Sequence, residues 1–477
     1  MTDHPMIIQG GMGIAVSGWP LANAVSSAGQ MGVVSGTAID AVFVRRLQLG
    51  DSDGAIRRAC NAFPIPGVTD DILDRYFIEG GKEPGTRFKQ KPMGKLKPSR
   101  RLQDLIVVAN FVEVWLAKEG HTQPVGINYL EKIQAPTIAS LYGAALAGVD
   151  YVLIGAGIPR AIPGILDRLA AGLPVEMRVD LKKATADDDP YIRFDPAEYA
   201  GGVPPPIKRP LFLAIVSSHI LGTLLTRNPE TSVDGFIIEG PSAGGHNAPP
   251  RAKEGLNELG EPIYGEKDVP DLEVFRELGL PFWMAGSYAR PEQVKLALSE
   301  GATGVQVGTA FAYCEESGLT PEVKAQVLEE SRQKRLRVFT DPIGSPTGFP
   351  VKVLKLSGTA SEDDVYTGRT RICDLGYLRS AYVGEDGKKG WRCPAEPVDD
   401  YVRKGGDLAD TVGRKCLCNS LMANIGLGQI KRDGSPEPIL VTSGDDAADV
   451  ARFVPEDGSS YRAKDVIDYL LGGIATG

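Results

Sequence analysis

The stretch that decides the fold is 282-FWMAGSYARPEQVKLALSEGATGVQVGT-309. Two short apolar runs, residues 282–285 and 304–308, flank a segment in which apolar residues recur at helical spacing. Two parallel strands of one sheet need a crossover of about this length between them, usually an α-helix. The stretch therefore predicts a strand–helix–strand unit in which a glycine lies at the end of each strand.

Runs of the same kind recur along the first two thirds of the chain. They lie at residues 6–9, 30–35, 124–128, 151–154, 211–216, 235–239, 282–285 and 304–308. Several lack polar–apolar alternation, which is typical of strands covered on both faces. Eight such strand–helix units favour a closed TIM (β/α)8 barrel. The alternative, a doubly wound sheet, would carry a GxGxxG fingerprint after the first strand, where this chain has GGMG at residues 10–13.

Other segments do not follow this alternation of strand and helix. Residues 37–122 form a large insertion after the second strand, and residues 174–195 hold two alternating runs that predict a surface hairpin. Residues 321–338 predict the helix of the eighth unit. From about residue 340 the chain becomes rich in glycine, cysteine and charge, with helical stretches near 416–426 and 463–471. We therefore predict a barrel at residues 1–339 and a cysteine-containing C-terminal extension at 340–477.

The composition is that of a globular enzyme: 477 residues, of which 42% are hydrophobic and 24% charged. A formal net charge of −9 repels phosphate backbones, which disfavours nucleic acid as a partner. No apolar run approaches the roughly 18 residues of a membrane helix, and no leader precedes the first strand. We therefore expect a cytoplasmic protein without a membrane anchor. The oligomeric state and the physiological substrate do not follow from the sequence.

Glycine and hydroxyl residues follow the seventh and eighth strands, where TIM barrels usually bind phosphate. These residues are Ala285, Gly286 and Ser287 after the seventh strand, and Gln306, Gly308 and Thr309 at the end of the eighth. Glycine lets a backbone amide approach an anion, and a hydroxyl adds a donor. The two loops therefore predict a site for a single phosphomonoester. The alternative is that these glycines only turn tight barrel corners.

The sixth strand leads into EGPSAGGHNAPPR, residues 239–251. Gly244 and Gly245 allow the imidazole of His246 to come close over a cofactor, and an imidazole of ordinary pKa exchanges a proton at neutral pH. A histidine is more often structural, but the Gly-Gly setting favours a catalytic role for this one. Of the four histidines in the chain, His219 is the other candidate for ligand contact.

Three ordered motifs resemble the nitronate monooxygenase (2-nitropropane dioxygenase) superfamily, which includes FMN-dependent enoyl-ACP reductases. The motifs are PMIIQGGM at residues 5–12, AGGH at 243–246 and GVQVGTAF at 304–311. The resemblance implies a TIM barrel with FMN at its C-terminal mouth and His246 as the catalytic histidine. It implies cofactor contacts from Gln9, Gly10, Gly11, Met12, Asn128, Ser217, Ser218, Gly244, Gly245, Ala285, Gly286, Ser287, Gln306, Gly308 and Thr309.

Two positions depart from the family pattern. Ser242 occupies the position that is commonly acidic in the family's E-[SA]-G-G-H stretch, and Gly286-Ser287 replaces a common Gly-Gly. The first departure weakens any family-based account of how His246 is oriented. The second still permits phosphate binding.

The resemblance implies one of two reactions on a small-molecule substrate. In a nitronate monooxygenase, His246 removes the proton α to a nitro group or binds the nitronate, and O2 completes an oxidation that releases nitrite. In the alternative, an enoyl-thioester reductase, NAD(P)H reduces the flavin and His246 protonates the α-carbon of a CoA or acyl-carrier thioester. The first is our prediction. A metal-bearing interaction scaffold without activity is a third, non-enzymatic hypothesis.

Three further features lie outside these motifs. Residues 82–101 carry eight Lys or Arg, which suits a nucleotide phosphate, CoA or an acidic carrier protein, or else forms a solvated basic loop. Residues 252–270 predict a lid in which Arg251 reads an anionic group, or a passive loop. In the extension, the sequence predicts either free thiols or a zinc or iron–sulfur site at Cys373, Cys393, Cys416 and Cys418.

Overall fold

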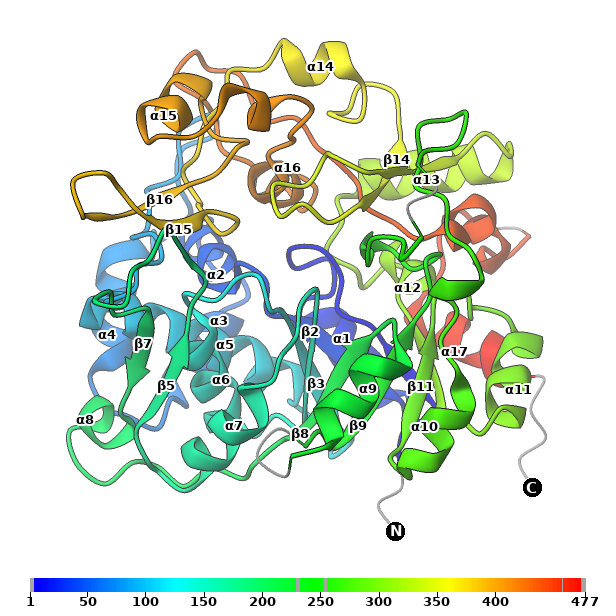
Figure 1. The fold of residues 1–477 in the computed structure, drawn as a ribbon, viewed down its shortest axis with the longest axis horizontal. Helices are drawn as coiled ribbons and strands as arrows, with labels where there is room; N and C mark the ends of the chain where they lie inside the picture. The colour runs from blue at the N-terminus through cyan, green and yellow to red at the C-terminus, as the bar shows by residue number, and fades with distance from the viewer. Residues whose placement is uncertain (1–3, 229–231, 253–254, 457, 473–477) are drawn as a thin grey trace.

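The computed structural model describes residues 4–228, 232–252, 255–456 and 458–472, and a closed parallel barrel forms its centre (Figure 1). The barrel strands are β1 (Ile7–Gln9), β2 (Met31–Ser35), β3 (Val125–Leu130), β4 (Tyr151–Gly155), β8 (Leu211–Val216), β9 (Gly235–Glu239), β11 (Phe282–Ala285) and β12 (Gly304–Val307). Pairing of β1 with both β2 and β12 closes the barrel. Each predicted run forms one strand, so the TIM barrel is confirmed.

Helices cover the outside of the barrel, as in the strand–helix units that the sequence predicts. They are α1 (Trp19–Ser27), α2 (Ile39–Gln48), α5 (Arg100–Ala117), α6 (Thr137–Leu146), α7 (Ile162–Ala170), α9 (His219–Thr226), α10 (Leu272–Leu278), α11 (Pro291–Ser299) and α13 (Pro321–Arg332). A short helix, α12 (Thr309–Ala312), directly follows β12. Among the described residues, no helix combines the length and the apolar character needed to cross a membrane.

Side chains fill the barrel interior. Ile8, Leu153, Ile237 and Trp283 belong to one buried cluster contributed by different strands, and all are at most 1% exposed. The indole Nε1 of Trp283 donates a hydrogen bond to the backbone oxygen of Pro5 at 2.8 Å. The barrel is therefore a packed core rather than a pore.

Two insertions add structure at the side of the barrel. The large insertion holds α3 (Ala55–Asn61), α4 (Val68–Tyr76) and α5. The predicted hairpin is confirmed, because β5 (Val175–Arg178) pairs antiparallel with β7 (Tyr191–Phe194). Between them lies β6 (Leu181–Lys182), and α8 (Pro196–Ala200) follows. Alternate residues of β5 are buried, as the alternating sequence pattern predicts.

The predicted helix at residues 321–338 is wrong in its last part. Helix α13 ends at Arg332, Lys334 has a positive φ of 55°, and β13 (Arg337–Asp341) begins three residues later. Strand β13 pairs antiparallel with β14 (Val351–Lys355), from Arg337 opposite Lys355 to Asp341 opposite Val351. The left-handed residue ends the helix, and a partner further along the chain makes residues 337–338 extended.

The C-terminal extension lies over one end of the barrel, as the yellow and orange ribbon in Figure 1 shows. It holds β14, α14 (Asp363–Thr367), β15 (Ser380–Val383), β16 (Lys389–Arg392), α15 (Val398–Arg403), η3 (Leu408–Thr411), α16 (Leu417–Ala423), η4 (Asp445–Phe453) and α17 (Ala463–Leu471). It pairs with the barrel loops twice. Strand β14 binds β10 (Gly245–His246), and β15 binds β6 in parallel. The boundary at residue 340 stays a prediction, although it falls inside β13.

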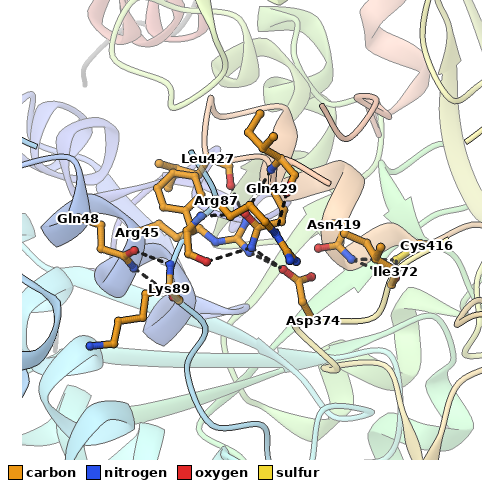
Figure 2. A network of polar contacts seen from close by, with 12 residues as sticks. Arg45, Gln48, Arg87, Lys89, Ile372, Asp374, Cys416, Asn419, Leu427 and Gln429 are labelled. Atoms are coloured by element: carbon orange, nitrogen blue, oxygen red, sulfur yellow. Dashed lines mark hydrogen bonds and ion pairs between the residues drawn. The ribbon is translucent and has the colours of Figure 1, made fainter. Parts of the chain in front are cut away.

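A buried polar network joins two parts of the large insertion, helix α2 and the segment around Phe88, to the extension (Figure 2). The guanidinium of Arg45 on α2 donates to Asp374 Oδ2 at 3.0 Å and to the backbone oxygen of Leu427 at 2.5 Å. Gln429 donates to Asp374 at 3.1 Å and exchanges two hydrogen bonds with the backbone of Phe88 in the insertion. These contacts fix the extension against the large insertion.

Removing the negative charge from this network is expected to destabilise the protein. The side chains of Arg45 and Asp374 are only 5% and 4% exposed, so Asp374→Asn leaves a buried guanidinium without its counter-charge. We expect the free energy of unfolding to fall by about 3–5 kcal/mol in chemical denaturation. The matched control is Asp71→Asn, since Asp71 is 52% exposed and its ion pairs lie at the surface. Equal stability of the two variants would contradict this role.

Candidate functional site

A cavity lies at the mouth of the barrel, where the carboxyl ends of β1, β9, β11 and β12 meet. It contains about 890 Å³ of empty space, including its opening to solvent. We call it the mouth cavity. The predicted residues that line it are Gly10, Gly11, Met12, Gly244, Gly245, Ala285, Gly286, Ser287, Gln306, Gly308 and Thr309. The fold therefore brings the three sequence motifs, which lie far apart in the chain, around one space.

The extension forms part of the wall of this cavity, which the sequence did not predict. Its contribution consists of Asn424, Val441, Thr442, Ser443 and Asp446. The approach is close: a Cβ on Gly244 would lie 2.6 Å from the backbone nitrogen of Gly444. The amide of Gly444 donates to Thr309 Oγ1 at 3.0 Å, and the amide of Asp445 donates to the backbone oxygen of Ser242 at 3.1 Å. Only glycine at position 244 allows this packing.

Four predicted cofactor residues are not part of the cavity wall: Gln9, Asn128, Ser217 and Ser218. Gln9 is fully buried, and its side-chain oxygen accepts from the amide of Val33 at 3.1 Å. Asn128 donates to the backbone oxygen of Leu153 at 2.9 Å, and a Cβ on Gly11 would lie 2.4 Å from Asn128 Cβ. Both side chains thus support the backbone that lines the cavity. Direct contact of either with a cofactor stays a prediction.

The residues after β8 lie beside a different, smaller cavity. Ser217 lines it together with Glu239 and Arg251, while Ser218 is the residue before α9. The guanidinium of Arg251 donates to the backbone oxygens of Ser217 and Lys267, and its amide donates to Asp268 at 2.8 Å. Arg251 is thus engaged within the protein. Residues 253–254 of the predicted lid lie outside the described residues, and the lid stays a prediction.

His246 lies on β10, directly after two glycines of the cavity wall, but its side chain is not part of that wall. Its Nε2 lies 2.6 Å from Ser345 Oγ in the extension. Ser345 Oγ also lies 2.8 Å from Thr347 Oγ1, and the amide of Thr347 donates to it at 3.2 Å. The ring of Phe349 packs edge-on against the imidazole, with 6.5 Å between centroids. A serine of the extension thus holds the imidazole, where the family pattern has an acid at the position of Ser242.

Burial moves the pKa values of two groups in opposite directions at this site. It lowers the pKa of His246 to about 4, so the imidazole is neutral at pH 7. It raises the pKa of Glu239, the last residue of β9, to about 8. Glu239 lines the mouth cavity, and no hydrogen bond or ion pair to another described residue is found for its carboxyl group. At neutral pH the site therefore offers a neutral base and a protonated acid.

The mouth cavity fits a flavin mononucleotide by two observations. Gln306 Oε1 is buried without a hydrogen-bond partner among the described residues, so it is available to a polar ligand. A Cβ on Gly308 would meet only Met12, at the ordinary contact distance of 3.5 Å, which leaves space beside this glycine. The hydroxyls of Ser287 and Thr309 lie at the same end. Backbone amides and hydroxyls, rather than Lys or Arg, would hold a phosphate here.

The basic segment 82–101 is mostly engaged with the protein itself. Lys91 forms an ion pair with Asp40 at 2.8 Å, in which both side chains are at most 5% exposed. Arg100 pairs with Asp104 at 2.8 Å. Lys82, Arg87 and Lys89 donate to backbone oxygens. These contacts explain much of the segment's charge without an external partner, and its role as a docking patch stays a prediction.

The predicted zinc or iron–sulfur site at Cys373, Cys393, Cys416 and Cys418 is not supported. Among the residues that the structure describes, no group of three or more Cys, His, Asp or Glu side chains could hold a metal ion. All four cysteines are free, and burial raises the pKa of each thiol. Cys393 and Cys416 pack with Ala395 in one buried cluster. Protonated, buried thiols of this kind behave as small apolar side chains.

Comparisons with known proteins agree with the sequence motifs. Residues 216–347 match the family model described as nitronate monooxygenase. The probable nitronate monooxygenase of Bacillus subtilis (strain 168) is 33% identical over 100 residues, which are 21% of this chain and 27% of that protein's length.

Two solved structures are similar over most of the chain. FabK from Thermotoga maritima has a TM-score of 0.47 and 17% identity, covering 99% of this chain and 92% of that one. Nitroalkane oxidase from Streptomyces ansochromogenes has a TM-score of 0.47 and 16% identity, covering 98% and 95%. The family match includes His246 and the strands β11 and β12 with their glycines. Residues 216–347 of this chain are thus similar to the nitronate monooxygenase family.

Proposed function

We propose that this protein is an FMN-dependent oxidoreductase that acts on a small-molecule substrate. The observation that carries the proposal is the convergence of three glycine-containing segments, after β1, β11 and β12, with the Gly244–Gly245 turn around the mouth cavity. Gly286 and Gly308 would border the phosphate, and Gly10, Gly11 and Met12 would border the ring. When bound, FMN supplies the redox chemistry, and the protein supplies position and electrostatics.

In this proposal His246 moves a proton at its Nδ1 atom. Ser345 Oγ can donate its hydrogen to Thr347 Oγ1 and accept one from His246 Nε2, which places the imidazole proton on Nε2. No hydrogen bond from Nδ1 to another described residue is found, so its lone pair is available to a substrate. A neutral imidazole held in this way accepts the acidic proton α to a nitro group, or hydrogen-bonds a nitronate already formed.

The reaction that we favour is the oxidation of alkyl nitronates with O2, as in a nitronate monooxygenase. The second candidate is an NAD(P)H-dependent enoyl-thioester reductase. One observation favours this alternative: Glu239 carries a protonated carboxyl group into the mouth cavity at neutral pH. Reduction of an enoyl thioester requires a proton for the α-carbon, whereas oxidation of a nitronate does not.

The visible spectrum of the purified protein tests the proposal first. Flavin absorbance is expected, and a colourless protein that cannot be reconstituted with FMN would overturn the proposal in favour of a scaffold. Anaerobic mixing with NADPH or NADH then separates the two reactions. Rapid bleaching of the flavin would indicate the reductase, whereas oxygen uptake that depends on a nitronate and needs no nicotinamide would indicate the monooxygenase.

The pH dependence of activity should reflect the low pKa of His246. With a neutral nitroalkane, kcat/KM is expected to fall only as the pH approaches 4, because the buried imidazole takes up its proton there and ceases to be a base. An exposed histidine would instead lose activity near pH 6.5. The measurement is kcat/KM across this range for the wild-type protein and for His246→Ala. If kcat/KM of the wild-type protein fell near pH 6.5 and that of His246→Ala did not, burial would not have lowered the pKa of His246 and the argument would be contradicted.

A further inference from the structure

A second cavity, with about 1000 Å³ of empty space including its opening to solvent, is lined by Pro346 and Thr347, and the additions to the barrel build most of its wall. The large insertion contributes Lys91 and Gly94, the hairpin segment contributes Lys182, and the extension contributes Thr347 and Trp391. Pairing of β6 with β15 fixes Lys182 opposite Tyr382, next to the β15–β16 hairpin that carries Trp391. The second cavity therefore depends on all three additions to the barrel.

Cations outnumber carboxylates in the wall of this cavity, although the whole chain has a net charge of −9. Lys91 is neutralised by its ion pair with Asp40. The wall then has three other cations, Lys132, Lys182 and Arg379, and one other carboxylate, Asp180. No hydrogen bond or ion pair from the Lys182 ammonium group to another described residue is found. Lys132 is 3.9 Å from Glu131, a loose ion pair. These charges suit an organic anion.

Arg379 and Trp391 form a fixed platform in the same wall. The guanidinium of Arg379 donates to the backbone oxygens of Gly376 at 3.0 Å and Gly94 at 3.2 Å. No hydrogen bond from its Nη1 group to another residue of the described ranges is found. It lies 5.6 Å from the centre of the Trp391 ring. A flat aromatic group can stack on such a platform while a phosphate binds the nearby cations. This combination suits a nucleotide better than a simple anion.

Two contacts connect the second cavity to the candidate catalytic histidine. Thr347 lines the cavity, and its hydroxyl is linked through Ser345 Oγ to His246 Nε2 by distances of 2.8 and 2.6 Å. Lys132 lies 5.5 Å from the centre of the Phe349 ring, against which the imidazole also packs. Gly244 and Gly245, which directly precede His246, line the mouth cavity, while the side chain of His246 is part of neither cavity wall.

We propose that the second cavity binds the nucleoside diphosphate part of a cosubstrate whose reactive end reaches the site beside His246. The proposal rests on the proposed oxidoreductase function and adds the class of cosubstrate. Nicotinamide dinucleotides and coenzyme A thioesters share the adenosine diphosphate group that these residues would recognise. The lysines bind the phosphates, and the Arg379–Trp391 platform stacks with the base.

Titration of the purified holoenzyme with ADP tests this proposal by calorimetry and by tryptophan fluorescence. We expect saturable binding, quenching that Trp391→Phe removes, and weaker binding at higher salt. Lys182→Gln and Lys132→Gln are each expected to weaken ADP binding about fivefold to tenfold. The matched control is Lys388→Gln, since this lysine lies between β15 and β16 but its side chain is 83% exposed and is not part of the cavity wall.

Competition experiments identify which cosubstrate carries the nucleotide that binds in the second cavity. Displacement of ADP by NADPH at a lower concentration than by CoA would identify a nicotinamide dinucleotide, and the reverse order would identify a thioester. Absence of saturable ADP binding, or equal binding by the cavity variants and Lys388→Gln, would overturn the proposal. These measurements are independent of turnover. A yellow protein that oxidises nitronates but does not bind ADP would therefore keep the proposed function and refute this inference.

Discussion

Turnover of a neutral nitroalkane is expected to fall by about 10²- to 10⁴-fold when His246 is replaced by alanine. The variant lacks the imidazole whose Nδ1 is available as a base and whose Nε2 is held by Ser345. A preformed nitronate has already lost the proton in question, so its oxidation should decline far less. The measurement compares kcat/KM for the two forms of one substrate in the wild-type protein and in the variant. Loss confined to the neutral form would support proton abstraction.

Two further variants complete this test. Ser345→Ala removes the partner of Nε2 but keeps the base, and it is expected to lower neutral nitroalkane turnover by about tenfold or less. His219→Ala is the matched control, because His219 Nδ1 accepts from the amide of Asp271 and the residue lines neither cavity. Full neutral nitroalkane turnover by His246→Ala would refute the proposed role of this histidine.

FMN binding is expected to weaken by about 10³-fold in Gly308→Glu. The added carboxylate would lie beside the proposed phosphate, and two like charges about 4 Å apart repel by about 4 kcal/mol at an effective dielectric constant of 20. The fold should tolerate the change, since a Cβ at this position meets only Met12 at 3.5 Å and the φ of Gly308 is −110°. Flavin content after purification and FMN affinity by titration are the measurements.

The control for this prediction is Gly202→Glu, because no heavy atom lies within 4 Å of a Cβ built there. Both variants should have the melting temperature of the wild-type apoprotein, which shows that the loss concerns the cofactor and not the fold. If Gly308→Glu retains as much flavin as Gly202→Glu, the phosphate does not lie beside Gly308 and the assignment of the mouth cavity must change.

The spacing of apolar residues within each segment predicted the barrel well, because each strand and each helix has its own periodic pattern. The strands β11 and β12, for example, lie where residues 282–285 and 304–308 predict them. Prediction was wrong where a distant partner decides the conformation. Residues 337–338 continue a helical pattern, but they pair with Lys355 and Leu354 of β14. That pairing has no signal within a short window of sequence.

In the candidate site, too, the sequence predicted some of the residues and missed others. Glycines of the mouth cavity and His246 follow from motifs, whereas Glu239 and Ser345 were not singled out. Ser345 lies 99 residues beyond His246, and none of the three motifs includes it. Glu239 was visible at the end of its strand, but only the packing around it raises the pKa of its carboxyl to about 8.

The sequence by itself determined the barrel and the positions of its glycine-rich ends, because strand periodicity and glycine's backbone freedom are local properties. Tertiary structure alone decided that the extension lies over the mouth, that Ser345 holds His246, and that a second cavity forms beside them. These features depend on contacts between residues far apart in the chain. Such contacts form only when burial brings the segments together and requires each buried polar group to find a partner.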